Sequence, residues 1–387
     1  MVVEPKVRGF ICVTAHPEGC KENVRRQIAY AKEQRKENQY PKKVLVIGCS
    51  TGYGLASRIS AAYIGGAATL GIMFEKESNG KRTATPGLYN TRAFEEFATK
   101  DGLYAKTING DAYSREVKEQ AIQIIKEDLG KVDMVVYSLA APRRTMADGT
   151  VYQSTLKTTE KDFTEKSWNV DTDKISEVTI TPATEEEVES TVKVMGGEDW
   201  IDWIDALKEA DVLADHAVTV AYSYIGPELT YPVYNNGTIG MAKKDLYDSS
   251  KKITEKYESD GIKAYISVNK ALVTQASSAI PIVPLYFAIL YKVMKEKYIH
   301  EGCIEQMSRL FTDKLFVESP VTDEKGQIRL DDWEMREDVQ KEVMDIWGKV
   351  KEDNLRELAD VDGYWEDFYH LFGFHFDNVD YTQDVAI

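Results

Sequence analysis

Apolar runs alternate with helix-patterned segments over most of the chain. Bounded runs rich in apolar and β-branched residues lie at 44–47, 67–74, 103–108 and 132–138. The run at 44–47 predicts a strand buried on both faces, as in parallel sheets. The other three runs predict further strands. Segments with apolar positions at helical spacing lie before and between them, at 16–37, 55–64, 89–100 and 113–129. This alternation predicts βαβ units, and therefore a doubly wound parallel α/β sheet.

The pattern resumes after a polar interruption at 145–215, which is rich in Thr, Glu and Asp. Within it we expect short strands at 168–180 and helices at 184–195 and 198–210. Predicted strands at 217–223 and 262–268 then flank a helix at about 238–260, which would complete a sheet of six or seven strands. We interpret 145–215 as an insertion or cap within a single domain spanning 1–387. Residues 318–387 form an acidic, aromatic C-terminal extension, with a helix near 334–351.

Composition narrows the possible partners. The formal net charge is −16 over 387 residues, which argues against nucleic acid or an anionic membrane as a partner. The longest apolar run, 279–294, contains Pro281 and Pro284 and is too short to span a bilayer. The four cysteines form no CxxC pair, so we expect reduced thiols in a cytoplasmic protein and no metal site.

A glycine-rich loop follows the first predicted strand directly. Gly48, Gly52 and Gly54 have the spacing G-x3-G-x-G and open a predicted helix. Gly48 would allow a tight turn, Gly52 close approach of a pyrophosphate, and Gly54 close packing of helix on strand. The free N–H groups of the helix N-terminus would then face the phosphates. In this context the loop predicts a Rossmann-type dinucleotide site, with the glycine spacing of short-chain dehydrogenases.

Other candidate cofactor residues follow successive strands. Glu75, after the second strand, could accept the ribose hydroxyls of NAD and repel the extra phosphate of NADP, or it could be a solvated loop charge. Asp111 and Ala112 follow the third strand, where an acid could meet the adenine amino group. Ser138 and the small residues after it follow the fourth, where backbone could approach the nicotinamide ribose.

A reductase on this fold needs an acid beside the nicotinamide, which a tyrosine near a lysine can supply. Two pairs compete. Tyr247 and Lys251 match Y-x3-K literally, whereas Tyr234 and Lys243 are separated by eight residues. The second pair would point apart on a continuous helix, but the Asn-Asn-Gly sequence at 235–237 predicts a turn between them. We therefore favour Tyr234, which lies near the end of strand 217–223.

The stretch from Tyr222 to Leu246, which includes Tyr224, Tyr234 and Lys243, resembles the trans-2-enoyl-CoA reductase family, including the larger bacterial NADH-dependent enoyl-ACP reductases. The resemblance extends over nearly the whole chain, through the glycine loop, 138–144, 193–200 and 268–274. The Tyr-x8-Lys spacing separates it from the smaller enoyl-ACP reductases, which use Tyr-x6-Lys.

The resemblance implies NADH-dependent reduction of the 2,3-double bond of an enoyl-CoA or enoyl-ACP. Tyr234 would be the proton donor, Lys243 a cofactor ligand, and Tyr224 a contact of the thioester carbonyl. The NADH site would be lined by Gly48, Cys49, Ser50, Thr51, Gly52, Tyr53, Phe74, Glu75, Asp111, Ala112, Leu139, Ala140, Leu272, Val273 and Thr274. The resemblance also indicates a monomer, with acyl carrier protein as a possible partner.

Two assignments stay open at this point. Residues 279–317 would supply helices that line an acyl pocket, although the apolar helix at 279–294 could equally be core against the sheet. Arg143 and Arg144 could bind the carrier's phosphates or simply be solvated. The alternative function is a short-chain carbonyl reductase or alcohol dehydrogenase using Tyr247 and Lys251, and a non-enzymatic NADH sensor would need neither tyrosine nor lysine.

Overall fold

A seven-stranded parallel sheet forms the centre of the protein, as seen in a computed structural model that describes residues 1–9, 11–139, 141–275, 277, 280 and 282–387. The strand order is β13-β12-β11-β6-β3-β4-β5, and every pairing is parallel. The strands are β3 (Lys43–Ile47), β4 (Ala68–Met73), β5 (Ala105–Asn109), β6 (Val132–Tyr137), β11 (Leu213–Ser223), β12 (Lys263–Val268) and β13 (Ile328–Arg329). The order reverses between β3 and β6, which is the switch point of a Rossmann-type sheet. The expected doubly wound fold is confirmed.

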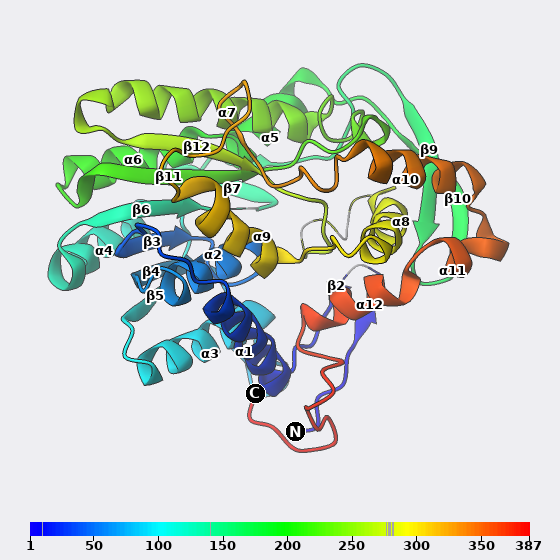
Figure 1. Ribbon diagram of the computed structural model, residues 1–387, viewed down its shortest axis with the longest axis horizontal. Helices are drawn as coiled ribbons and strands as arrows, with labels where there is room; N and C mark the ends of the chain where they lie inside the picture. The colour runs from blue at the N-terminus through cyan, green and yellow to red at the C-terminus, as the bar shows by residue number, and fades with distance from the viewer. Residues whose placement is uncertain (10, 140, 276, 278–279, 281) are drawn as a thin grey trace.

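Helices cover both faces of this sheet (Figure 1). Alternate residues of β3 show the division: Val44 and Val46 pack in one apolar cluster, Leu45 and Ile47 in another. The first cluster involves α1 (Pro17–Glu33), α2 (Gly52–Tyr63), α3 (Pro86–Lys100) and α9 (Cys303–Arg309). The second involves α4 (Arg115–Ile124), α6 (Glu198–Glu209) and α7 (Thr238–Lys256).

A third apolar cluster lies beyond the sheet, where Figure 1 shows the C-terminal helices gathered around α8. It combines α8 (Val283–Glu296), α10 (Glu337–Lys349), α11 (Leu355–Leu358) and α12 (Val361–His370) with the hairpin of β9 (Phe163–Asn169) and β10 (Lys174–Ile180). Helix α8 is buried along nearly its whole length. Val233 and Tyr234 belong to the same cluster, so the C-terminal extension packs beside the predicted catalytic turn.

The structure differs from the expected layout in two places. The seventh strand, β13, comes from the C-terminal extension, and its two residues are too short to show a periodic pattern. Within 145–215, helix α6 buries Trp200, Trp203 and Leu207 against the sheet. It is therefore the ordinary crossover helix between β6 and β11, and the interruption consists of the smaller elements before it: β7 (Arg143–Thr145), β8 (Val151–Gln153), β9, β10 and α5 (Glu185–Met195).

None of the helices among the described residues combines the length and the apolar character that crossing a membrane requires.

Candidate active site

The glycine loop has the geometry that its sequence predicts. Gly48 and Gly52 both have positive φ, at 83° and 53°. A Cβ on Gly54 would lie 1.8 Å from the Gly48 carbonyl oxygen, so only glycine lets α2 approach the loop this closely. Thr51, the N-cap of α2, makes no side-chain cap, and the first turn holds no acidic residue. The N–H groups of this turn are thus left for an anion.

A cavity of about 730 Å³ opens at the carboxyl ends of β3, β4, β5 and β6. Its lining includes most of the predicted cofactor residues: Gly48, Ser50, Thr51, Gly52, Tyr53, Phe74, Glu75, Asp111, Ala112, Leu139 and Thr274. The topological switch point and the glycine loop therefore open into one cavity, where ligands of such sheets bind.

Glu75 lies at the end of β4, with its carboxylate against the glycine loop. Ser50 Oγ donates to Glu75 Oε1 at 2.6 Å. The backbone of Glu75 is held by Asn109, whose side chain both accepts from its N–H and donates to its carbonyl. A Cβ on Gly87 would lie 2.1 Å from Oε1, so the neighbouring helix α3 needs glycine there. The acid is fixed at the cavity edge and is not a freely solvated loop charge.

Asp111 and Ala112 form a turn after β5. Asp111 Oδ1 accepts from the Tyr113 N–H at 3.0 Å. The Ala112 carbonyl accepts from Trp203 Nε1 at 3.1 Å and from Lys118 Nζ at 3.2 Å. Lys118 is itself paired with buried Asp199 at 2.6 Å. This ion pair anchors the turn to α4 and α6.

The predicted turn before α7 is present, and the helix is not continuous through it. Helix α7 begins at Thr238 with Gly237 as N-cap. Tyr234 donates its N–H to the Thr230 carbonyl, and Asn236 to that of Tyr231, as in a compact turn. A Cβ on Gly240 would lie 2.1 Å from the Tyr234 carbonyl oxygen, so the small residues at the helix start allow it to pack on the turn.

Tyr234 and Tyr224 are neighbours. Their ring centroids are 4.8 Å apart in an edge-to-face arrangement. Tyr234 is buried, and its hydroxyl makes no hydrogen bond to another residue that the structure describes. Burial raises the pKa of both phenols above its ordinary value. Both hydroxyls therefore keep their protons at neutral pH and can act as hydrogen-bond donors.

Lys243 lies in the second turn of α7, half-buried. Its ammonium donates to the carbonyl of Tyr222 at the end of β11, at 2.9 Å. Burial lowers the pKa of Lys243 to about 8. The lysine thus points toward the carboxyl end of β11, and Tyr224 is the first residue after that strand.

The alternative pair lies elsewhere. The Tyr247 hydroxyl donates to the Lys325 carbonyl at 2.8 Å, and Lys251 Nζ lies over the Tyr247 ring at 4.2 Å. Neither residue lines the cavity at the sheet edge. Tyr224, Tyr234 and Lys243 do not line it either. Tyr234 is favoured over Tyr247 because its ring contacts Tyr224, which follows β11 directly, whereas Tyr247 contacts Lys325 and Lys251.

Some predicted cofactor residues are not brought to the cavity lining. The Cys49 thiol is buried against Arg58, with Sγ 3.6 Å from Nη1. Leu272 and Val273 are buried in the third cluster, and the Val273 N–H is bonded to the Tyr291 hydroxyl. Ala140 lies outside the described residues. Lys243, predicted as a cofactor ligand, does not line the cavity either. The cofactor role of all the predicted residues, inside or outside the lining, stays a prediction.

The structure also shows where the apolar segment 279–294 and the two arginines at 143 and 144 lie. Among the described residues of 279–294, Ile280 lines the cavity, while α8 itself is core. Arg144 is buried and paired with Glu198 at 3.0 Å, so it is not a solvated loop charge. Arg143 is exposed.

Sequence reasoning missed several residues near the tyrosines. Glu334 is fully buried and accepts from the Tyr224 and Tyr286 hydroxyls. Lys270 is also buried, and its carbonyl accepts from the Tyr53 hydroxyl at 2.8 Å. Lys270 could have been noticed because it lies in the stretch 268–274, which carries part of the family resemblance. Nothing in the sequence around Glu334 distinguishes it from the other acidic residues of the C-terminal extension.

Three family models cover most of the chain. The NAD(P)H binding domain of trans-2-enoyl-CoA reductase matches 2–80, and the trans-2-enoyl-CoA reductase catalytic region matches 82–316. A third model, described as an enoyl reductase FAD binding domain, matches 322–385.

The described residues of 322–385 do not fit a flavin dinucleotide. Helix α12 is capped by Asp360, whose carboxylate already accepts from the Gly363 N–H, and a Cβ on Gly363 would lie 2.2 Å from that carboxylate. Helix α10 has Glu337 and Asp338 in its first turn. Acidic side chains at both N-termini would repel a diphosphate. The aromatic residues of the segment are mostly buried in the packing around α8.

Full-length relatives agree with the first two models. The chain is 55% identical to the trans-2-enoyl-CoA reductase [NADH] of Ruminiclostridium cellulolyticum, over 100% of this chain and 98% of the relative. It is 56% identical to the enoyl-[acyl-carrier-protein] reductase [NADH] of Flavobacterium johnsoniae, with the same coverage. The crystal structure of Treponema denticola trans-2-enoyl-CoA reductase in complex with NAD superposes with a TM-score of 0.96 at 47% identity, over 100% of this chain and 98% of that one. With the glycine loop, the sheet order and the Tyr234 turn in place, the chain belongs to the trans-2-enoyl-CoA reductase family.

Proposed function

We propose that this protein reduces the 2,3-double bond of trans-2-enoyl thioesters with NADH. The observation that carries the proposal is the pair of protonated phenols, Tyr224 and Tyr234, beside a sheet edge whose cavity begins at the free N-terminus of α2. The names of the relatives support the same reaction and the same cofactor.

The residues at the sheet edge offer a place for each part of the cofactor. The first turn of α2 would hold the diphosphate, and Glu75 would accept the adenosine ribose hydroxyls. Asp111 and Ala112 would face the adenine. Leu139, Thr274 and Lys243 would lie toward the nicotinamide ribose. The bound cofactor supplies the hydride that adds to C3 of the acyl chain.

The two tyrosines would act on the thioester. As the hydride reaches C3, negative charge develops on the thioester oxygen, and donors placed at that oxygen lower the barrier. Tyr224 would donate to this oxygen, and Tyr234 would supply the proton that completes the saturated product. The Lys243 ammonium lies next to this region and adds positive charge.

The acyl carrier is a finer question. The relatives include reductases named for enoyl-CoA and for enoyl-acyl-carrier-protein. We propose that the chain accepts either carrier, since the chemistry concerns only the thioester. A series of matched CoA and carrier-protein thioesters of increasing chain length, compared by kcat/KM, measures the preference.

Oligomeric state and location stay predictions. We expect a monomer, which sedimentation of the purified protein tests directly. We also propose that the protein works in the cytoplasm, since its four cysteines are free thiols.

The direct test is to mix the purified protein with crotonyl-CoA and NADH and follow the nicotinamide absorbance. We expect loss of absorbance together with formation of butyryl-CoA. If the absorbance stays constant under conditions where the protein is folded and binds NADH, the proposed reaction is wrong.

A further inference from the structure

The C-terminal extension delivers a buried acid to the predicted catalytic tyrosines. Glu334 has 0% exposure and lies between β13 and α10. Its Oε1 accepts from the Tyr286 hydroxyl at 2.7 Å and from the Tyr224 hydroxyl at 3.1 Å. Its Oε2 accepts from the Ala271 N–H at 2.7 Å. Both carboxylate oxygens are therefore occupied by donors.

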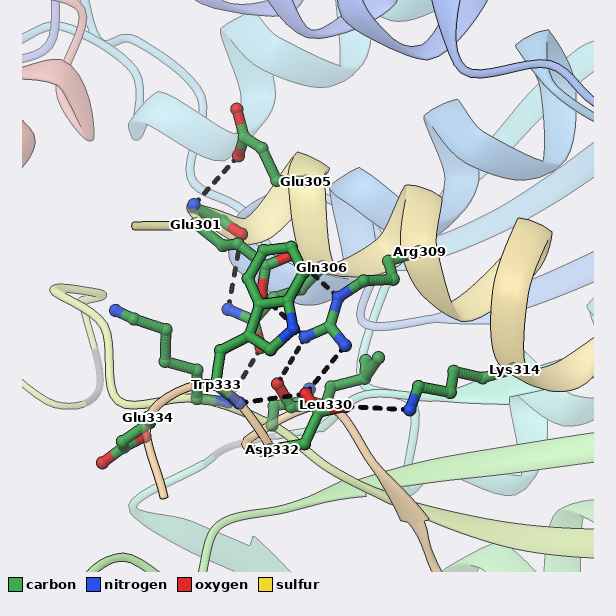
Figure 2. A network of polar contacts seen from close by, with 12 residues as sticks. Glu301, Glu305, Gln306, Arg309, Lys314, Leu330, Asp332, Trp333 and Glu334 are labelled. Carbon is green, nitrogen blue, oxygen red and sulfur yellow. Dashed lines mark hydrogen bonds and ion pairs between the residues drawn. The ribbon is translucent and has the colours of Figure 1, made fainter. Parts of the chain in front are cut away.

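A separate polar network fixes the backbone that carries Glu334. Arg309 of α9 forms a two-nitrogen contact with Glu301 and also bonds Asp332 and the Leu330 carbonyl. Its guanidinium lies over the Trp333 ring at 4.3 Å. Figure 2 shows these contacts on one side of the segment, while the Glu334 side chain extends away from them. The network fixes the backbone of the segment, and the Glu334 side chain contacts the tyrosines without taking part in the network.

The contact creates a conflict over one proton. A phenol has a single proton to donate. While Tyr224 donates to Glu334, it has none for the thioester oxygen. The conflict disappears when Glu334 carries a proton, since its O–H can then donate to the Tyr224 oxygen.

We propose that Glu334 is a positioning residue for Tyr224, which fixes the phenol and, by its own protonation state, decides whether Tyr224 can donate to the substrate. In the ionised state Glu334 accepts the phenol's hydrogen bond. In the protonated state, with the proton taken from solvent, the order becomes Glu334 O–H to Tyr224, and Tyr224 O–H to the thioester oxygen. No covalent bond other than that O–H changes.

The groups around Glu334 have opposite effects on its pKa. Burial and nearby Asp331 raise the pKa of Glu334, whereas the Lys270 ammonium, the Ala271 N–H and the Tyr286 hydroxyl favour the ionised form. Tyr224, Tyr234 and Tyr53 are the other titratable groups that interact with it. Because burial has the largest influence, the pKa of Glu334 lies above the ordinary glutamate value of about 4.3. The carboxyl group therefore stays protonated to a higher pH than an exposed glutamate does.

Two substitutions separate positioning from packing. Glu334→Gln keeps the shape and cannot ionise. With its oxygen on the Ala271 N–H, its NH2 group faces the phenols as a protonated acid would. Glu334→Leu removes every polar contact. We expect E334Q to retain kcat within about 3-fold and to lose the decline of kcat with rising pH, and E334L to lose about 10-fold or more in kcat with little change in NADH affinity.

A double-mutant cycle shows whether the effect passes through Tyr224. In a Tyr224→Phe background we expect E334L to add less than about 2-fold. The matched control is Glu337→Gln, an exposed acid in the first turn of α10 that lies outside this network. It should leave both kcat and its pH profile unchanged.

The inference rests on the proposed function, and the two fail differently. A wild-type protein with no reductase activity refutes the function. In an active protein, the inference about Glu334 is refuted by an E334L variant with wild-type kcat, by losses that multiply fully with Tyr224→Phe, or by an E334Q variant with the wild-type pH profile.

Discussion

The two ends of the catalytic region are built in different ways. At the cofactor end, consecutive residues 48–54 make the glycine loop, and the predicted lining residues Glu75, Asp111 and Leu139 follow successive strands. At the tyrosine end, Tyr224 and Glu334 meet although 110 residues separate them. The first end is a local consequence of backbone conformation, and the second depends on how the C-terminal extension packs. Short motifs therefore identify the cofactor end, while the tyrosine end is complete only in three dimensions.

Two helix N-termini sharpen the same contrast. Helix α2 has no side-chain cap and no acid in its first turn, and it opens into the cavity. Helix α12 is capped by Asp360 and carries Asp362 in its first turn. What distinguishes an anion site is an N-terminus whose N–H groups are left free. The described part of the C-terminal extension thus contributes Glu334 to the tyrosine end, and its helix α12 offers no free N-terminus to a nucleotide phosphate.

The largest expected effect is at the tyrosine end. Tyr234→Phe removes the proposed proton donor and should lower kcat about 100-fold or more, with the Kd for NADH unchanged. Steady-state rates with crotonyl-CoA and a fluorescence titration with NADH check both parts. Tyr247→Phe is the matched control and should retain wild-type rates. The reverse result would restore the carbonyl reductase alternative.

A second substitution disturbs the cofactor end. Gly54→Ala places a methyl group 1.8 Å from the Gly48 carbonyl oxygen, so the loop or the helix must shift. We expect NADH binding about 10-fold weaker and a lower unfolding midpoint. Gly348→Ala near the end of α10 meets nothing within 4 Å and serves as the control. Unchanged affinity in G54A would mean that the loop does not hold the diphosphate.

Glu75 tests cofactor choice at the same end. Glu75→Gln removes the charge that would repel the 2′-phosphate of NADPH while keeping the side-chain size. The ratio of kcat/KM for NADH to that for NADPH should fall about 10-fold. Glu77→Gln, which loses only an exposed pair with Arg92, should leave the ratio unchanged. Equal ratios in wild type and E75Q would remove the proposed role.

The smallest effect is a pH dependence at Lys243. Its pKa, lowered to about 8 by burial, means that the ammonium is present below that pH and is lost above it. The kcat/KM for NADH should therefore be halved near pH 8 and fall further as the pH rises. Arginine does not titrate here, so Lys243→Arg should flatten this decline. Because Glu334 is proposed to cause a decline of its own, the comparison is made in the E334Q background. There, a decline that persists in K243R would point to Lys270, whose pKa burial also lowers to about 8.

Much of the fold was predictable because burial on both faces leaves a clear apolar run in the central strands β3, β4 and β6. The Tyr234 turn was predictable for a similar local reason, since Asn-Asn-Gly interrupts the helix pattern. Strand β13 was not, because two residues carry no period. Glu334 was not, because an acid in an acidic extension looks solvated until packing encloses it. The role of α6 as a helix that packs on the sheet was not predictable either, because it depends on where Trp200 and Trp203 are buried.

The most direct test of the whole account is the destination of the hydride. Crotonyl-CoA is reduced with NADH that carries deuterium at the transferable position, and the product is analysed by mass spectrometry and NMR. The account predicts butyryl-CoA with deuterium at C3 and a solvent-derived hydrogen at C2. Deuterium at the carbonyl carbon, or at C2, would contradict it.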